Sequence, residues 1–332
     1  MPMARRISAP IGQSSESTAI GLPSSALERN CSVARTLDIL SDSWSFLLIR
    51  ECFFGARRFD EFQGILKLPR GTLTEVLKKL MNESILNRVQ YSARPPRFEY
   101  RLTEMGMDLY PTMLALMIFG DKWLTSGGKA PLQLRHKACQ CCCAPQVTCS
   151  VCGCEISANR VSYRDGPGAG AVIPSIRRRS HRPSKPDQLE RTRPCSVART
   201  LRAIGDRWSF LIIREAFFGI RRFDELQFKL GIAPGILTDR LLRLTAEEIF
   251  ARSKYRDRPE RFEYRLTEKG KDLYGPLIVM MRWGDHWLSD GRLPLKIRHL
   301  DCDSDFEPIV SCNRCGNELK AREAEYSLAY RL

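Results

Sequence analysis

No stretch of this sequence is apolar for long enough to cross a lipid bilayer. The longest uninterrupted apolar run, residues 113–119, is far shorter than the ~18–20 residues that a membrane helix requires. Residues 1–30 are rich in Ser and other small residues, and they lack the apolar segment of a secretory signal. We therefore expect an N-terminal tail without a fold of its own and an intracellular protein with no membrane partner.

Signatures of common enzyme classes are also missing. The sequence has neither the His-Glu-x-x-His of zinc proteases nor the Gly-x-Ser-x-Gly of serine hydrolases. It holds only four histidines, so few side chains can act as general bases near neutral pH. These absences predict that the chain is not an enzyme and requires no catalytic cofactor.

Positive charge and cysteine, by contrast, are abundant. Lys and Arg number 53 against 38 Asp and Glu, which gives a formal net charge of +15. Such an excess attracts polyanions and favours a nucleic acid as partner, although surface Lys and Arg also keep proteins soluble. The 13 cysteines of an intracellular protein are expected to be thiols or metal ligands rather than disulfides.

The sequence is internally duplicated. The segment Cys-Ser-Val-Ala-Arg-Thr-Leu at 31–37 recurs unchanged at 195–201, an offset of 164 (195 minus 31). At the same offset, Arg-Phe-Glu-Tyr-Arg-Leu-Thr-Glu at 97–104 recurs at 261–268. This period exceeds the ~20–50 residues of a solenoid repeat, so each copy is a whole domain. Residues 160–194 between the copies, rich in Gly, Pro and Arg, are typical of a flexible basic linker.

The first copy predicts four short helices. Apolar spacing and breaks place them at 33–40, 43–54, 59–66 and 72–83. Asp42 or Ser43 can cap the second helix. The buried stripe predicted for the fourth helix consists of Leu73, Val76, Leu77 and Leu80.

A hairpin and an apolar helix follow. Two β-prone runs, 89–91 and 98–102, flank a turn rich in Pro and Arg. Thr103 can then cap a last helix that continues to about Leu124 and carries more apolar surface than one small domain covers. The predicted fold is mainly α, with a helix-turn-helix and a small β-hairpin wing in each copy.

These elements and their motifs resemble the HxlR-type winged helix-turn-helix regulators of bacteria. The motifs occur in both copies, at 31–129 and 195–293, and include Cys-x-Val-Ala-Arg-x-Leu, Asp-x-Trp-x-Phe-Leu-x-Ile-Arg-Glu, Gly-x-Arg-Arg-Phe-Asp-Glu and Gly-Asp-x-Trp. The resemblance implies two tandem winged helix-turn-helix domains in a cytoplasmic, nucleoid-associated protein. It also implies double-stranded DNA as partner and a dimer joined through the first and last helices.

The fourth helix of each copy, 72–83 and 236–247, is the predicted recognition helix, because a helix fits the major groove and can contact base edges there. The candidate contact residues are Arg70, Thr72, Thr74, Glu75 and Lys78 in the first copy and Thr238, Asp239, Arg240 and Arg243 in the second. Related proteins commonly begin this helix with Ser-Pro, which this chain lacks, so the usual side-chain cap is in doubt. The alternative is that these residues are only a solvated helix face.

The wings are the second candidate surface. Their arginines, represented by Arg94, Arg97, Arg258 and Arg261, are predicted to contact phosphates or enter the minor groove. Arg97 and Arg261 could instead form ion pairs with the neighbouring Glu99 and Glu263, and the sequence leaves both alternatives open.

A Cys-rich segment follows each domain, at 130–159 and 294–332. Each contains His-x-x-Cys, nine further residues and Cys-x-x-Cys-Gly, and Zn²⁺ prefers four such nitrogen and sulfur ligands. The candidate structural zinc ligands are His136, Cys139, Cys149 and Cys152 in the first segment and His299, Cys302, Cys312 and Cys315 in the second. Reduced thiols are the alternative. Zinc is favoured for the second segment, while four surplus cysteines leave the first undecided.

Cys31 and Cys195 stand just before the first helix of each copy. A thiol near a helix N-terminus can become reactive toward oxidants, and the resemblance implies that some relatives sense oxidants there. The alternative is a small buried residue that packs a domain interface.

The sequence therefore predicts a sequence-specific regulator of transcription, acting as a repressor on two half-sites. One chain would form an internal pseudo-dimer, or two chains would form a homodimer. The alternative is a winged-helix interaction or scaffold module that does not read DNA, suggested by the different second recognition helix.

Overall fold

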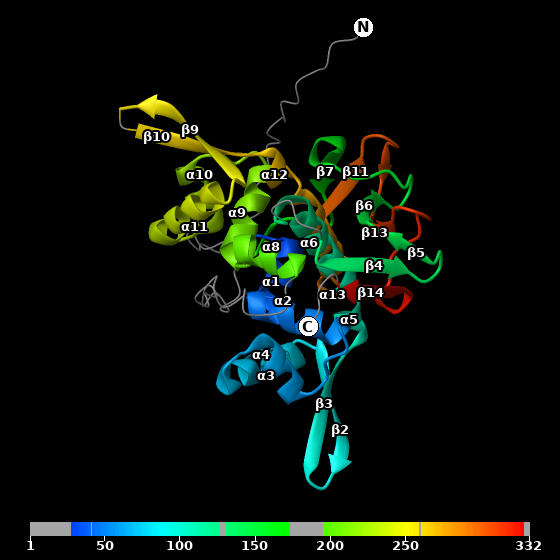
Figure 1. Cartoon of the computed structure of the whole chain (residues 1–332). Helices are drawn as coiled ribbons and strands as arrows, with labels where there is room; N and C mark the ends of the chain where they lie inside the picture. The colour runs from blue at the N-terminus through cyan, green and yellow to red at the C-terminus, as the bar shows by residue number, and fades with distance from the viewer. Residues whose placement is uncertain (1–27, 41, 126–129, 173–194, 259, 329–332) are drawn as a thin grey trace.

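A computed structural model describes residues 28–40, 42–125, 130–172, 195–258 and 260–328. Two copies of one helical domain lie against each other, and strands from the Cys-rich segments gather at one side (Figure 1). The first domain contains α1 (Ser32–Ile39), α2 (Ser43–Phe53), α3 (Phe59–Leu66), α4 (Arg70–Asn82), β2 (Leu86–Ala93), β3 (Pro96–Leu102), α5 (Glu104–Met107) and α6 (Tyr110–Trp123). The second contains α8 (Ser196–Ile204), α9 (Arg207–Phe217), α10 (Phe223–Leu230), α11 (Pro234–Ala246), β9 (Phe250–Asp257), β10 (Glu260–Leu266), α12 (Glu268–Lys271) and α13 (Tyr274–Leu288).

Local sequence signals account for most of these boundaries. The Asp42 carboxylate accepts a hydrogen bond of 2.9 Å from the backbone N–H of Ser45 and so caps α2, as predicted. The stripe predicted for the fourth helix is buried in full in α4. This helix begins at Arg70, two residues before its predicted start.

The prediction of one long last helix is wrong. The Thr103 hydroxyl caps the short helix α5, accepting a hydrogen bond of 3.0 Å from Gly106 N–H. A second helix, α6, begins at Tyr110 with Pro111 in its first turn. Proline has no N–H to donate, so it is tolerated at a helix start but interrupts a continuous helix.

The first helix of each domain packs against the last helix of the other domain. α1 lies against α13 and α8 lies against α6. The Thr200 hydroxyl donates to the backbone carbonyl of Leu116 over 2.9 Å, and the equivalent Thr36 hydroxyl approaches the Met280 carbonyl at 3.3 Å. Contacts that repeat with the two halves exchanged define an isologous, two-fold-like interface.

Small residues allow these helices to approach closely. A Cβ added to Gly120 would collide with the backbone of Ser196, and one added to Gly284 would collide with Ser32. Ser32 and Ser196 also donate hydrogen bonds to Asp285 and Asp121 of the facing helices. The Gly-Asp pair of each last helix therefore serves the packing of one half against the other.

Helices α2 and α9 extend the interface between the two halves. The ring of Phe46 stacks on that of Phe210 at 6.3 Å between centroids, and both side chains are buried. The Ser43 hydroxyl donates a hydrogen bond of 2.9 Å to the Gly205 carbonyl. The two halves thus share one apolar core.

The Cys-rich segments are interleaved rather than separate. They contribute β4 (Leu132–His136), β5 (Cys141–Cys143), β6 (Pro145–Cys149), β11 (Leu295–His299), β12 (Ser304–Asp305), β13 (Pro308–Cys312) and β14 (Ala324–Leu328). Two antiparallel sheets contain strands of both segments: β4 lies between β5 and β14, and β6 pairs with β13. In a third sheet, β11 lies between β12 and β7 (Val161–Asp165), which follows the first segment. A Cys-rich segment follows each domain, as predicted, and strands of the two segments pair with each other.

The predicted linker 160–194 is corrected in its first part. Strand β7 falls within it and pairs antiparallel with β11, from Val161 opposite His299 to Asp165 opposite Leu295. A further strand, β8 (Ala171–Val172), pairs with β1 (Glu28–Arg29) from the end of the predicted N-terminal tail. Residues 1–27 and 173–194 lie outside the described part of the chain. Among the described residues, no helix combines the length and apolarity needed to span a membrane.

Candidate nucleic-acid interface and metal centres

Helices α3 and α4 form the helix-turn-helix of the first half. The Glu61 carboxylate accepts backbone hydrogen bonds from Arg57 (2.8 Å) and Arg58 (3.0 Å), and these bonds lower the pKa of Glu61. The turn between the helices passes through Lys67, whose backbone is left-handed with φ 51°. The buried stripe of α4 then fixes which of its residues face outward.

The predicted contact residues of the first half all lie on the exposed side of α4: Arg70, Thr72, Thr74, Glu75 and Lys78. The guanidinium of Arg70 lies over the ring of Phe59 at 5.1 Å, and the Thr74 hydroxyl donates to the Arg70 carbonyl at 2.8 Å. In the described chain no side chain caps α4 at Pro69 or α11 at Ala233, in line with the doubt raised by the sequence.

The second half differs at two of its four predicted positions. Thr238 and Asp239 are exposed on α11. Arg240, however, is only 5% exposed, and its Nε lies 2.9 Å from the carboxylate of Asp206. Its expected place on the exposed face is therefore corrected.

The duplication explains the position of Arg240. At the offset of 164 it is equivalent to Val76, a member of the buried stripe of α4. Burial tends to lower the pKa of Arg240, but the negative charge of the facing Asp206 outweighs this effect, and the pKa is raised overall. The guanidinium therefore stays charged and paired. Arg243 is half-buried and donates a hydrogen bond to the backbone carbonyl of Arg202.

The wings project from both halves as two-stranded antiparallel hairpins, β2–β3 and β9–β10. The four arginines predicted to contact DNA are exposed near their tips: Arg94, Arg97, Arg258 and Arg261. Glu99 and Glu263 form ion pairs with Arg101 (3.0 Å) and Arg265 (2.8 Å). The alternative pairing of these carboxylates with Arg97 and Arg261 is not the arrangement seen.

Sequence reasoning missed a cation–π contact that recurs in both wings. The guanidinium of Arg88 lies 3.5 Å from the ring centroid of Phe98, and Arg252 lies equally close to Phe262. Cation–π contacts of this kind hold an arginine flat against the hairpin. The recurrence of Arg and Phe in both copies is the signal that could have identified them.

The predicted recognition helices and the wings lie on the outside of the two paired halves. In Figure 1, α4 and α11 lie on the left of the molecule, while β2–β3 and β9–β10 extend to opposite ends. The Cys-rich strands lie on the right, away from both recognition helices. The candidate nucleic-acid surface and the cysteine clusters therefore occupy different sides.

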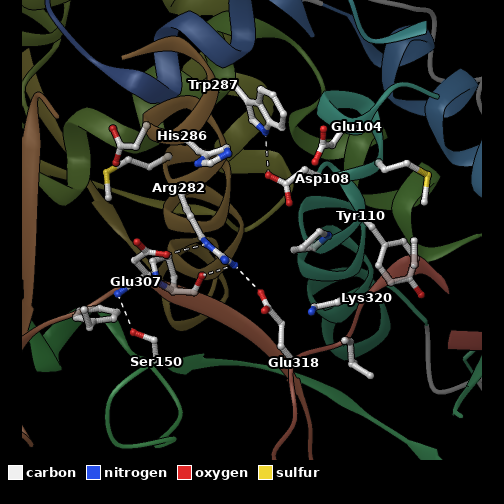
Figure 2. A pocket seen from close by; sticks show the side chains of 18 of the residues that line it. Glu104, Asp108, Tyr110, Ser150, Arg282, His286, Trp287, Glu307, Glu318 and Lys320 are labelled. Carbon is white, nitrogen blue, oxygen red and sulfur yellow. Dashed lines mark hydrogen bonds and ion pairs between the residues drawn. The ribbon is translucent and has the colours of Figure 1, made fainter. Parts of the chain in front are cut away.

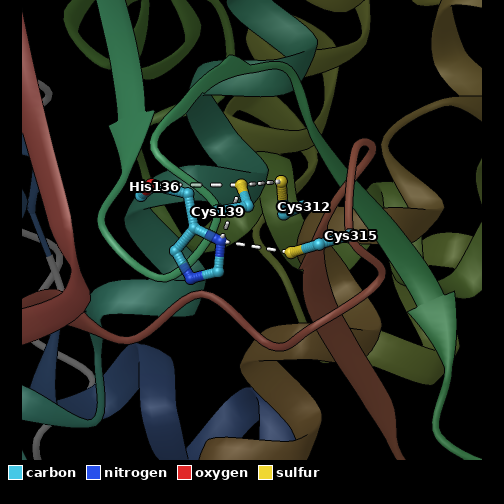
Figure 3. A group of neighbouring side chains, drawn as sticks. All are labelled: His136, Cys139, Cys312 and Cys315. Atoms are coloured by element: carbon cyan, nitrogen blue, oxygen red, sulfur yellow. Dashed lines mark hydrogen bonds between the residues drawn. The ribbon is translucent and has the colours of Figure 1, made fainter.

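The candidate metal ligands come together in an unexpected combination. The first group, called cluster A, consists of His136 and Cys139 of the first segment with Cys312 and Cys315 of the second (Figure 3). The second group, called cluster B, consists of Cys149, Cys152, His299 and Cys302. In each cluster the four potential ligand atoms lie within 4.8 Å of one another. All eight predicted residues are thus brought together, but their expected grouping within one segment is corrected.

The strand pairings cause this exchange. The pairing of β6 with β13 places the Cys-x-x-Cys turn of each segment beside the other segment. Both histidines, His136 and His299, have no exposed surface. Of the surplus cysteines, Cys141, Cys142 and Cys154 are exposed and Cys143 is half-buried, and all four stand outside the clusters.

Cys31 and Cys195 are also positioned between the halves. Cys195 is buried and Cys31 is half-buried, each as the N-cap of its first helix. Burial tends to lower the pKa of Arg214, but Cys31 and Glu215 beside it raise the pKa above its ordinary value. Sequence reasoning missed that the thiol of one half faces an arginine of the other.

A wide groove separates α5 and α6 of the first half from α13 and the Cys-rich strands (Figure 2). Arg282 projects into it between Glu318 (2.7 Å) and Glu307 (3.3 Å). The indole of Trp287 donates a hydrogen bond of 2.9 Å to Asp108 across the groove. These polar groups pair with one another, and the hydrogen bond from Trp287 to Asp108 joins the two halves across the groove.

Comparison with known proteins agrees with this architecture. The model of the family described as HxlR-like helix-turn-helix matches residues 39–127 and 203–292. An HTH-type transcriptional regulator of Mycobacterium tuberculosis is 46% identical over 129 residues, which cover 38% of this chain and 81% of that protein. The HTH-type transcriptional regulator YdeP of Bacillus subtilis is 35% identical over 94 residues, covering 28% of this chain and 73% of that one.

A solved structure titled as a transcription factor of Pseudomonas aeruginosa is also similar. It shares 40% sequence identity over 28% of this chain and 64% of its own length, with a TM-score of 0.25. The two family matches fall on the two copies recognised from the repeated motifs. The chain therefore belongs to the HxlR-like helix-turn-helix family, and it carries the family's domain twice.

Proposed function

We propose that this protein is a sequence-specific, double-stranded DNA-binding regulator of transcription. The observation that carries the proposal is the exposed polar face of α4, flanked by a wing with exposed arginines at its tip. A helix of this kind can contact base edges in the major groove, while the wing contacts phosphates or the minor groove. Family membership and the names of the relatives support the same function.

We further propose that the two winged domains of one chain bind DNA together, as the two chains of a homodimer would. The symmetric packing of α1 on α13 and of α8 on α6 supports this arrangement. A pseudo-two-fold protein fits a pseudo-palindromic site, with α4 on one half-site and α11 on the other. Binding of such a site within a promoter would exclude polymerase, which makes repression the expected direction of control.

A second candidate function is favoured by the surface of the second half. There Leu242 is 58% exposed on α11 and Phe228 is 67% exposed on α10. The equivalent of Leu242 in the first half is Lys78, a cation. A more apolar face fits contact with thymine methyl groups, or it fits a protein partner in place of base reading.

The experiment that tests the first proposal selects binding sites from fragmented genomic DNA with the full-length protein. Affinity for a selected site and for random duplex is then measured by fluorescence anisotropy near physiological salt. We expect a preference of at least ~10³-fold for the selected site. An equal affinity for both duplexes would contradict sequence-specific binding and favour the interaction module.

Substitutions test which residues contact the DNA bases. Replacing both Arg70 and Lys78 with Ala is expected to reduce this preference, because α4 would lose two exposed donors. Replacing Phe228 and Leu242 with Ser distinguishes the second candidate. If α11 reads DNA, this change weakens the selected site, and if the face serves a protein partner, DNA affinity stays unchanged.

A further inference from the structure

We propose that clusters A and B each bind one zinc ion, and that the two ions cross-link the halves of the pseudo-dimer. Each cluster offers three cysteines and one histidine. The His-x-x-Cys pair of a cluster comes from one Cys-rich segment and the Cys-x-x-Cys pair from the other. A metal bound in either cluster therefore joins parts of the chain that belong to different halves.

The distances within the clusters match tetrahedral coordination. Zinc lies ~2.3 Å from thiolate sulfur and ~2.0 Å from imidazole nitrogen, so tetrahedral angles separate two sulfurs by ~3.8 Å and a sulfur from a nitrogen by ~3.5 Å. In cluster A, His136 Nδ1 lies 3.5 Å from Cys139 Sγ and 3.3 Å from Cys315 Sγ, and Cys139 Sγ lies 3.8 Å from Cys312 Sγ.

Cluster B repeats this geometry. His299 Nδ1 lies 3.3 Å from Cys152 Sγ and 3.5 Å from Cys302 Sγ, while the sulfurs of Cys149 and Cys302 are 3.9 Å apart. A disulfide would require sulfurs only ~2.0 Å apart. Two clusters with the same donors at the same separations indicate a shared ligand rather than coincidental neighbours.

The Cys-x-x-Cys turns are shaped for thiolate ligands. The backbone N–H of Val151 points to Cys149 Sγ at 3.4 Å, and that of Arg314 points to Cys312 Sγ at 3.4 Å. Gly153 and Gly316, the residues after each turn, have φ values of 72° and 74°. Only glycine adopts this left-handed conformation readily, so both turns can close tightly around an ion.

The histidines are oriented for the same role. Each directs Nδ1 toward the sulfurs, while Nε2 stays buried and away from the cluster. His299 Nε2 lies 3.4 Å from the carboxylate of Asp301, which itself pairs with Arg160. His299 Nε2 makes no hydrogen bond to this carboxylate here; an imidazole that did donate one would be held in place as a metal ligand. All four positions of each site are filled by protein atoms, so the expected role is structural.

The test uses full-length protein purified in the presence of zinc and then freed of loosely bound metal. Metal per chain is measured by elemental mass spectrometry. We expect two zinc ions per chain, and cobalt titration of the metal-free protein should give tetrahedral absorption that saturates at two equivalents. A chain that retains no zinc and gives no tetrahedral cobalt spectrum would overturn the proposal.

Paired variants test the crossing itself. Cys139→Ser with Cys312→Ser removes two ligands of cluster A alone, so one zinc per chain is expected to remain. Cys139→Ser with Cys149→Ser removes one ligand from each cluster, and both ions are expected to be lost or weakened. Grouping within each segment predicts the opposite result for the two pairs, and that result would overturn the cross-link.

Unfolding of a variant would obscure the metal counts, so each variant is checked by circular dichroism. The exposed Cys154→Ser serves as the matched control and should keep both ions. Wild-type protein gives an independent measurement: alkylation should spare the six cluster cysteines when zinc is bound and reach them after chelation. Rapid alkylation of these cysteines in the zinc-loaded protein would also contradict the proposal.

Discussion

At the scale of single residues, the second half of the chain carries the buried, ion-paired Arg240 where the first half has the buried Val76. The guanidinium of Arg240 joins α11 to Asp206, and Asp206 also caps α9 through the backbone N–H groups of Trp208 and Ser209. A buried carboxylate without its cation is costly, since water cannot replace the missing partner.

Replacing Arg240 with Met is therefore expected to destabilise the fold by about 2–3 kcal/mol, which is less than the usual cost of breaking a buried pair because Arg243 remains 4.0 Å from Asp206. Urea unfolding measures the destabilisation. Arg258→Met on the wing is the control, with an expected change below about 0.5 kcal/mol. A similar, small effect of both changes would show that the pair does not stabilise the fold.

The raised pKa of the buried Asp285 predicts that the stability of the fold depends on pH. Burial raises its pKa from 3.8 to about 6, against the lowering effects of the Ser32 hydroxyl and Arg35. A carboxyl with a raised pKa favours the folded state in its protonated form. Its contribution is complete below the ordinary pKa and is lost as the pH rises through about 6.

The variant Asp285→Asn cannot undergo this titration. Between pH 4 and pH 7 its free energy of unfolding should gain about 2–3 kcal/mol relative to the wild type. Urea unfolding of both proteins across this range measures the difference between their free energies of unfolding. Groups that titrate in the same way in both proteins do not contribute to this difference. Parallel curves would contradict the assigned pKa.

At the scale of elements, the wings are expected to contribute charge rather than sequence preference. Removing the cation from one bound phosphate should reduce the slope of log affinity against log salt by ~0.9. Replacing Arg94, Arg97, Arg258 and Arg261 with Gln should therefore flatten the slope by up to ~3.6 and weaken binding of selected and random duplex similarly.

Arg298→Gln removes an exposed cation from β11, on the side of the molecule away from α4 and α11. It is the control for net charge, and it should leave the slope nearly unchanged. Equal slopes for the wing variant and the wild type would mean that the hairpins do not touch the DNA backbone.

At the scale of the whole molecule, the symmetric interface predicts that one chain occupies one pseudo-palindromic site. Native mass spectrometry of the complex with a minimal selected duplex should show one protein per duplex. Deleting one half-site should then weaken binding strongly without changing that ratio. Two chains on the minimal site would show that the functional unit is a dimer of chains, each contributing a single domain.

Local sequence determined much of this protein. The repeated motifs identified two domains, and capping and apolar spacing placed α2 and α3 to within a residue of their observed bounds. These signals are reliable because a cap or a buried stripe depends on residues within one or two turns of the same helix. The eight candidate metal ligands were identifiable for the same reason, since each pair lies within one short turn.

Only the tertiary structure decided how these pieces combine. His136 and Cys139 lie closer in sequence to Cys149 than to Cys312, yet the pairing of β6 with β13 brings the distant pair to them. Likewise, the alignment of the two copies places Arg240 opposite Val76, but it does not show that Arg240 pairs with Asp206. The spacing of residues along a chain reflects local geometry. Which half supplies the partner of a given strand or helix depends instead on how well the two similar halves pack, and residue spacing carries no information about that.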